Sequence, residues 1–166
     1  MPTIELRTVA DVMTRRLVTV REDDVIADIE EAMQRLRVRH MPVIDDSGML
    51  VGLVSHPDLL HAAASFLSVG EADRNVSIKQ VKVGRIMRRE VVTAEPGDSL
   101  VQAGELMWDA KIGCLPVIEA DGTLVGMITE ADFIAIAVEL LGGQIKKSDV
   151  EELARAPRTG RARLAM

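Results

Sequence analysis

Residues 51–60 of the sequence read VGLVSHPDLL, and residues 125–134 read VGMITEADFI. In each stretch an apolar run leads to a hydroxyl residue, and an aspartate follows three positions later. The two pairs are Ser55 with Asp58 and Thr129 with Asp132. Such a pair is typical of a capping box, which closes the first turn of a helix. It can also present a hydroxyl and a carboxylate to a ligand, and the two interpretations are compatible.

The two stretches belong to a longer internal repeat, in which the two copies align without insertions or deletions at a constant offset of 74 residues (Met13 to Met87). Many corresponding positions carry the same residue. They include Met13 and Met87, Asp24 and Asp98, Met33 and Met107, Pro42 and Pro116, and Gly48 and Gly122. A gapless match of this length indicates a duplicated structural unit.

Each copy predicts the order β-α-β-β-α. Short runs of β-type residues at 17–20 and 91–94 predict the first strand of each copy. Apolar residues at helical spacing then predict helices over 23–38 and 97–112. Two apolar strands around a turn follow, and a second helix begins at the hydroxyl residue of each motif. Neither copy has enough apolar surface to be comfortably stable alone.

Local signals refine these elements. Asp23 or Asp24 is expected as the N-cap of the first helix in one copy, and Asp98 in the other. The turn between the two apolar strands contains Gly48 in the first copy and Gly122 in the second, which is the usual hairpin signal. A Gly-Gly pair is expected to close the last helix.

The repeats are assigned to residues 8–67 and 82–141, with a linker at 68–81 between them. Residues 142–166 are expected to hold a short helix and a basic tail. The first ten residues are expected to pack against the second repeat, either as a strand or as a helix.

Composition limits the function. The net charge of −6 argues against nucleic acid or an anionic membrane as the main partner, and 2% aromatic residues leave few platforms for base stacking. A single cysteine excludes an intramolecular disulfide framework and fits a reducing compartment. No signal peptide is visible, and no apolar run approaches the roughly 20 residues that span a bilayer. A cytoplasmic protein is expected.

The repeated pattern VMTxxxVTV, followed by RHMPVID and LVGLVSxxDLL, resembles the cystathionine-β-synthase (CBS) domain pair over residues 8–141. The resemblance implies an α+β fold of two β-α-β-β-α repeats packed through their sheets about a pseudo-two-fold axis. It implies two clefts that bind an adenosine-containing ligand such as AMP, ADP, ATP or S-adenosylmethionine. It also implies a homodimer, with a signal passed to an effector protein that the sequence does not name.

The resemblance also implies roles for particular residues. The aspartate of each Ser/Thr-x-x-Asp motif would bind the ribose hydroxyls, the Ser or Thr would lie nearer the phosphate, and residues before the hairpin proline would line the base and phosphate region. The candidate ligand-binding residues are Thr19, Arg39, His40, Met41, Pro42, Ser55, His56 and Asp58 in the first copy, and Thr93, Cys114, Leu115, Pro116, Thr129 and Asp132 in the second.

The two copies differ on the phosphate side. Arg39 and His40 can meet a phosphate, whereas Gly113 and Cys114 at the corresponding positions cannot. The residue after the hydroxyl is His56 in the first motif, but in the second it is Glu130, which would repel a phosphate. We therefore expect unequal sites, of which one binds a nucleotide and the other is empty or prefers a less anionic ligand. Arg39 and His40 have a plain alternative as a solvated edge.

Other chemistry finds little support in the sequence. His40, His56 and His61 lack the spacing of metal ligands, and Cys114 is expected to be a small buried hydrophobe. No phosphate loop, nucleophile elbow or other catalytic motif occurs, so we expect a regulatory sensor that is not an enzyme and requires no cofactor. The alternatives are a structural dimerisation module with degenerate clefts and, more weakly, nucleic-acid association through the arginine-rich tail at 155–166.

Overall fold

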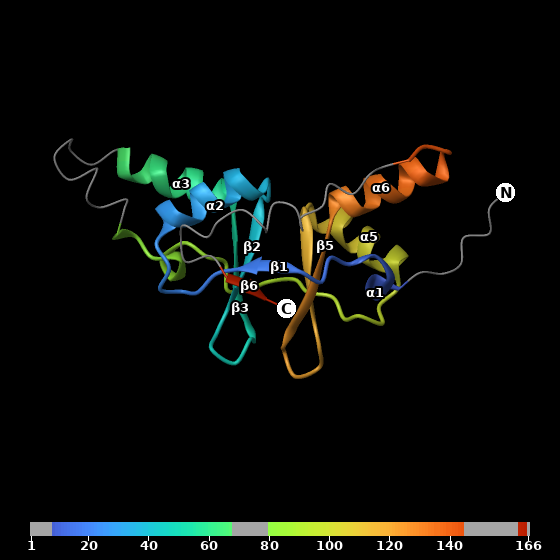
Figure 1. The fold of residues 1–166 in the computed structure, drawn as a ribbon, viewed down its shortest axis with the longest axis horizontal. Coiled ribbons are helices and arrows are strands. Elements are labelled where there is room, and N and C mark those ends of the chain that lie inside the picture. The colour runs from blue at the N-terminus through green and yellow to red at the C-terminus, as the bar shows by residue number, and fades with distance from the viewer. Residues whose placement is uncertain (1–7, 68–79, 145–162, 166) are drawn as a thin grey trace. The chain divides into compact units, whose positions relative to one another are not determined.

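The computed structural model describes residues 8–67, 80–144 and 163–165 (Figure 1). They form a mixed α+β fold in two compact units. The first-repeat unit contains residues 18–67, 80–91 and 163–165, and the second-repeat unit contains residues 8–17 and 92–144. Each unit has its own hydrophobic core of aliphatic side chains.

The first repeat has the predicted element order. Its elements are β1 (Leu17–Thr19), α2 (Ile26–Leu36), β2 (His40–Ile44), β3 (Leu50–Ser55) and α3 (His56–Leu67). Strands β2 and β3 form an antiparallel hairpin, in which His40 lies opposite Ser55. Next to β2, the backbone N–H of Val20 donates to the Pro42 carbonyl at 3.0 Å. Helix α2 buries one apolar face on this hairpin, as its 3.6-residue periodicity predicts.

The second repeat repeats this plan with one difference. Its elements are α5 (Leu100–Ala110), β4 (Cys114–Ile118), β5 (Leu124–Thr129) and α6 (Glu130–Leu140). The strand predicted at 91–94 is wrong, because only Ala94 makes a bridge, to Val117 of β4. The corresponding strand of the first repeat, β1, has a further partner in β6 (Arg163–Ala165). Residues 91–93 have no strand partner among the described residues.

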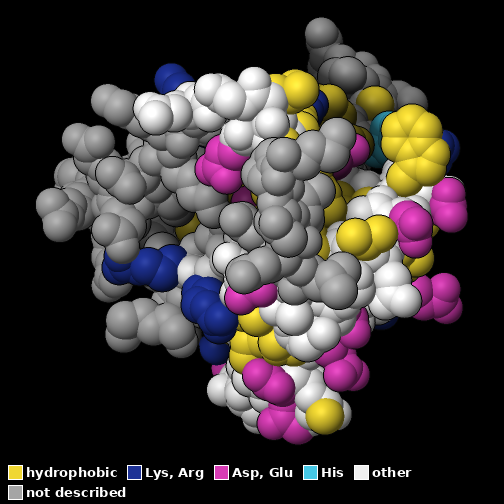
Figure 2. Space-filling model, turned by 90° about the vertical axis from the view of Figure 1, so that its right-hand side faces the viewer, with side chains coloured by type: hydrophobic (Ala, Val, Ile, Leu, Met, Phe, Trp, Pro, Cys, Tyr) yellow, Lys and Arg dark blue, Asp and Glu magenta, His cyan; other side chains and the backbone are white. Residues whose placement is uncertain are grey.

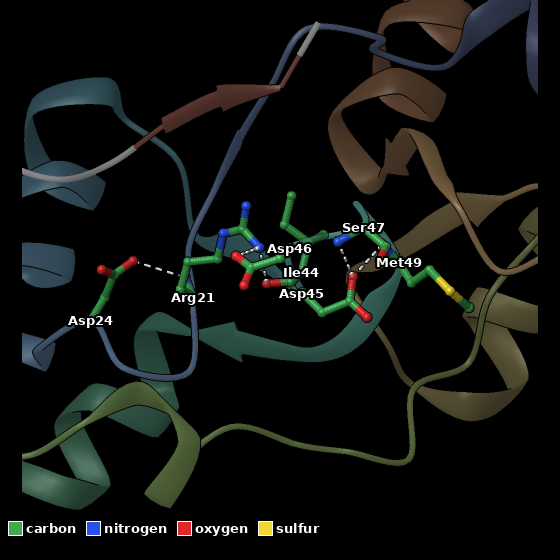
Figure 3. A network of polar contacts seen from close by, with 7 residues as sticks. All are labelled: Arg21, Asp24, Ile44, Asp45, Asp46, Ser47 and Met49. Atoms are coloured by element: carbon green, nitrogen blue, oxygen red, sulfur yellow. Dashed lines mark hydrogen bonds and ion pairs between the residues drawn. The ribbon is translucent and has the colours of Figure 1, made fainter.

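The predicted aspartate N-caps are also wrong. Helix α2 has Val25 as its N-cap and α5 has Ser99, neither with a side-chain capping bond. The carboxylate of Asp24 instead accepts the backbone N–H of Arg21 at 2.8 Å (Figure 3). Asp98 accepts from Glu95 at the same distance. These aspartates therefore close the turn before the helix, and the helix begins after it.

The hairpin turns confirm the glycine prediction. Gly48 has a φ of 84° and Gly122 a φ of 87°, which glycine adopts without steric cost. In the first turn Asp45 accepts backbone N–H bonds from Ser47 at 2.8 Å and Met49 at 3.0 Å (Figure 3). In the second turn Asp121 accepts the N–H of Thr123 at 2.9 Å, which lowers the pKa of Asp121.

The two repeats exchange their leading segments. Helix α1 (Val9–Val12) buries Val9 and Val12 in the core of the second-repeat unit, so of the first ten residues the described part packs there with a helix, and residues 1–7 lie outside the described residues. The 3-10 helix η1 (Val83–Arg85) buries Val83 in the core of the first-repeat unit. Both make the same contact at the repeat offset. Val9 N–H donates to the Asp98 carbonyl at 2.9 Å, and Val83 N–H donates to the Asp24 carbonyl at 2.8 Å.

In each exchanged segment a methionine side chain packs against a glycine of the neighbouring strand. The Met87 sulfur would lie 2.7 Å from a Cβ added to Gly52 of β3. A Cβ added to Gly126 of β5 would overlap the Met13 sulfur in the same way. The next residue then exchanges two backbone hydrogen bonds with the strand. Thr14 pairs with Met127 at 2.9 and 3.0 Å, and Arg88 pairs with Leu53 at 2.9 Å in both directions.

Two predictions fall partly or entirely outside the described residues. The linker expected at 68–81 is described only from residue 80, where residues 80–91 join the first-repeat unit. The short helix expected near 146–156 lies entirely outside them, and of the basic tail only β6 is described. Gly142 follows Leu141, the C-cap of α6, and has a φ of 85°, as expected for a glycine that closes a helix.

The close contact with Met13 predicts the effect of adding a methyl group at Gly126. We expect Gly126→Ala to lower the free energy of unfolding by about 1–3 kcal/mol, because the methionine must leave its position. Gly97→Ala is the matched control: nothing lies within 4 Å of its added Cβ, so its effect should stay within about 0.5 kcal/mol. Urea unfolding measures both. Equal unfolding midpoints for the two variants would contradict the proposed contact.

Candidate functional site

The first motif lies where β3 ends and α3 begins. Asp58 Oδ2 accepts the backbone N–H of Ser55 at 2.8 Å and also the hydroxyl of Ser55. In return, Ser55 Oγ accepts the backbone N–H of Asp58 at 3.4 Å. Ser55 is buried, and the Asp58 side chain is only 12% exposed. The hydroxyl and the carboxylate are therefore fixed relative to one another.

The second motif has the same geometry at the start of α6. Asp132 Oδ2 accepts the backbone N–H of Thr129 at 2.8 Å and the Thr129 hydroxyl at 3.0 Å. Thr129 is the N-cap and Asp132 completes the capping box. The capping interpretation of the motif is thus confirmed. It uses only one oxygen of each carboxylate, so the other oxygen can serve a second purpose.

The hydrogen-bond partner of this second oxygen, Oδ1, differs between the two motifs. Asp58 Oδ1 accepts a hydrogen bond from Arg88 Nε at 3.4 Å, and the Arg88 side chain is 65% exposed. At the repeat offset the position of Arg88 is occupied by Thr14, which lies beside β5. No hydrogen bond to Asp132 Oδ1 is found within the described residues. Sequence reasoning did not identify Arg88, because it follows the linker and reaches the first motif only through the exchange of segments.

The residues before the hairpin proline lie next to each motif. His40 pairs with Ser55 across the hairpin, and the backbone N–H of His56 donates to the Arg39 carbonyl at 2.9 Å. The structure therefore brings Arg39, His40 and His56 together around Ser55. In the second repeat Cys114 pairs with Thr129 in the same way.

Several other candidate residues are buried. The side chains of Met41 and Leu115 belong to the two hydrophobic cores, and Thr19 is buried on β1. Pro42 and Pro116 are buried in β2 and β4, where their carbonyl oxygens accept the backbone bonds of Val20 and Ala94. Thr93 is half-buried in the stretch that forms no strand. The more accessible candidates are Arg39, His40 and His56.

A cationic hollow of about 240 Å³ lies beside the first motif. It is lined by Met33, Gln34, Arg37, Val38, Arg39 and His56. The hollow combines two guanidinium groups with an imidazole, which is a suitable lining for an anionic group.

The second repeat carries different chemistry at the corresponding positions. Trp108 and Lys111 replace Gln34 and Arg37, and the Lys111 ammonium lies 4.1 Å from the centre of the Trp108 ring. Glu130 stands where the first repeat has His56. The two motifs are thus alike in their capping geometry and different in the charges around them.

Cys114 is buried, as expected. Burial and, to a smaller extent, the nearby Glu130 carboxylate raise the pKa of the Cys114 thiol to about 12. A thiol that stays protonated is a poor nucleophile. Within the described part of the chain, no cluster of three or more His, Cys, Asp or Glu could hold a metal ion, and no helix is long and apolar enough to cross a membrane.

Known proteins resemble this chain closely. The family model of the CBS domain matches residues 9–65 and 83–139. A CBS domain-containing protein of Dictyostelium discoideum is 31% identical over 80% of this chain and 92% of its own length. Homoserine O-acetyltransferase of Methanococcoides burtonii is 34% identical over 75% of this chain, which spans only 23% of that enzyme. The crystal structure of CBSX2 in complex with AMP has a TM-score of 0.69 and 32% identity, over 81% of this chain and 98% of its own.

The raised pKa of Cys114 predicts a pH dependence. Well below pH 9.0 the thiol is protonated in both the folded and the unfolded state. Between pH 9.0 and about 12 the unfolded state releases a proton that the folded state retains, so the free energy of unfolding should fall as the pH rises. Urea unfolding at several pH values, compared with Cys114→Ala, measures this contribution. A thiolate absorbance that appears in the folded protein near pH 9.0 would show that the thiol is not shielded.

Proposed function

The chain belongs to the CBS domain family, with two copies of the domain, and we propose that it is a regulatory module that binds an adenosine-containing ligand at its Ser/Thr-x-x-Asp motifs. AMP, ADP, ATP and S-adenosylmethionine are the proposed ligands. The observation that carries the proposal is the geometry of the two aspartates. A capping box fixes each aspartate through Oδ2. Oδ1 of Asp132 has no hydrogen bond among the described residues, and Oδ1 of Asp58 is bound by the largely exposed Arg88 at 3.4 Å, so a ligand can reach either oxygen. A related protein, CBSX2, has been solved in complex with AMP.

Simple chemistry connects this geometry to a nucleoside. A carboxylate accepts hydrogen bonds from both hydroxyls of a cis-diol such as ribose. The capping box fixes the aspartate before the ligand arrives, so little side-chain entropy is lost on binding. At the first motif, the N-terminus of α3 and the nearby Arg39 supply positive charge for a phosphate, and the imidazoles of His40 and His56 lie beside them.

We propose that ligand binding is passed on through a homodimer or a separate effector protein. A ligand shifts a conformational equilibrium only by its differential affinity for the two states. The proposed role is therefore regulatory and non-catalytic, and the ligand is a signal for which no further cofactor is needed. A cytoplasmic location is part of the proposal, because a single buried thiol suits a reducing compartment.

Ligand titration tests this function. We expect at least one of AMP, ADP, ATP and S-adenosylmethionine to bind with a Kd below about 1 mM, roughly −4 kcal/mol, in isothermal calorimetry. Asp58→Asn or Asp132→Asn should weaken binding about tenfold at its own site, because asparagine keeps one acceptor for the cap but loses the carboxylate.

Asp121→Asn is the matched control, since Asp121 lies in an exposed hairpin turn at the opposite end of β5 from Thr129. It should leave the Kd unchanged. Absence of binding by every ligand in the wild-type protein would refute the proposed function.

One surface favours a second role as an interaction module. Helix α6 is apolar over most of its circumference, yet Asp132 is its only buried residue. Ile134 and Leu140 of α6 and the following Leu141 are exposed, and so are Val101 and Trp108 of α5. Figure 2 shows exposed hydrophobic side chains next to acidic ones on the face that it presents. A helix that is apolar on all sides is normally covered, and we propose that a second copy of the chain covers this one.

The oligomeric state tests the second role. A charge at Ile134 would be buried in the proposed dimer, so Ile134→Lys should convert a dimer to a monomer in sedimentation equilibrium. Ala120→Lys adds the same charge at an exposed turn position and should leave the dimer intact. A wild-type protein that stays monomeric at high concentration would contradict the interaction role without affecting ligand binding.

A further inference from the structure

Arg88 lies on an exchanged segment and contacts the first motif, whereas the corresponding residue beside the second motif is Thr14. Its backbone is fixed by two hydrogen bonds of 2.9 Å to Leu53, and its carbonyl lies close to Gly52. Its side chain is largely exposed and extends to Asp58 Oδ1. The backbone position is therefore set by the fold, whereas the guanidinium is free to change partners.

The ion pair changes what Asp58 can offer a ligand. Ser55 already occupies Oδ2, and Arg88 occupies Oδ1. A ribose that binds Asp58 must therefore displace the guanidinium or share the oxygen with it. An uncharged nucleoside offers the guanidinium only neutral acceptors in exchange for the carboxylate, whereas a phosphate offers it a charged and bidentate partner.

The surroundings of Arg88 favour the same exchange. Arg39 and His56 line the cationic hollow beside the β3–α3 junction, and Arg88 pairs with Leu53 of β3, so an anion near this motif meets guanidinium groups from two segments of the chain. At the second motif Thr14 stands in place of Arg88, and Glu130 stands in place of His56. Asp132 keeps an oxygen without a cationic partner among the described residues.

We propose that Arg88 is a specificity-determining residue, which makes the Ser55/Asp58 motif select phosphorylated over unphosphorylated adenosine ligands. By the same reasoning Thr14 leaves the Thr129/Asp132 motif to ligands without a phosphate. This inference rests on the proposed function, and it assigns to each motif its own ligand class. Binding of a nucleotide then moves Arg88 from Asp58 to the phosphate, so the ligand directly changes a contact of an exchanged segment.

The test isolates each motif and compares AMP with adenosine. In the Asp132→Asn background, which leaves the first motif, Arg88→Thr should weaken AMP binding about tenfold. The same change should strengthen adenosine binding about two- to fivefold, because an exposed ion pair no longer has to be broken. Calorimetry measures the ratio of the two Kd values. In the Asp58→Asn background, Thr14→Arg should shift the second motif toward AMP.

Arg89→Thr is the matched control. It removes the same charge from the next residue, but Arg89 pairs with Glu22 at 2.9 Å and does not contact Asp58. It should leave the ratio of Kd values unchanged. Arg88→Thr with an unchanged ratio, or an equal change in Arg89→Thr, overturns the role of Arg88 while ligand binding itself stands. If neither AMP nor adenosine binds any variant, the ligand classes assigned to the two motifs are wrong and this inference fails, whereas the proposed function fails only if ADP, ATP and S-adenosylmethionine do not bind either.

Discussion

The fold depends on two close approaches, in which a methionine lies against a glycine of a neighbouring strand. Met13 lies on Gly126 and Met87 on Gly52, and a Cβ at either glycine would overlap the methionine side chain. Because the strand has no side chain at that point, the exchanged segment can come close enough to form backbone hydrogen bonds with it. The same approach places Arg88 and Thr14 beside the two motifs. The chemistry of the candidate site therefore begins with a steric constraint in the core.

Much of the fold follows from the duplicated pattern. Strong helical periodicity predicts α2 and α5, and the glycine turns predict both hairpins. The errors have physical causes. The run at 91–94 has strand composition, but a strand also needs a partner. Its counterpart in the first repeat, β1, pairs with β6, which is far away in the sequence, so a local pattern cannot show which of the two runs has such a partner. Asp24 and Asp98 have the composition of N-caps, yet their carboxylates bind the backbone three residues earlier.

The site is less predictable than the fold. The Ser/Thr-x-x-Asp spacing identifies both capping boxes, because their atoms are close in sequence. The Arg88–Asp58 contact joins residues on either side of the linker, so no local pattern reveals it. The repeat offset holds the missing signal. The sequence predicts that the first ten residues pack on the second repeat. At the repeat offset residues 8–17 correspond to residues 82–91, so the latter would be expected to pack on the first repeat, with Arg88 among them.

The exchange of segments also limits how such a chain can evolve. Each compact unit takes its hairpin from one repeat and its leading helix from the other. A single repeat, copied or deleted as a continuous piece of gene, would carry a leading segment with no strand to lie on and a strand with no segment to cover it. Recombination that moves the whole pair therefore preserves both contacts, whereas recombination that moves one half breaks them, so the fold favours inheritance of the two motifs together even as their side chains diverge. The heritable module of this protein is the duplicated pair.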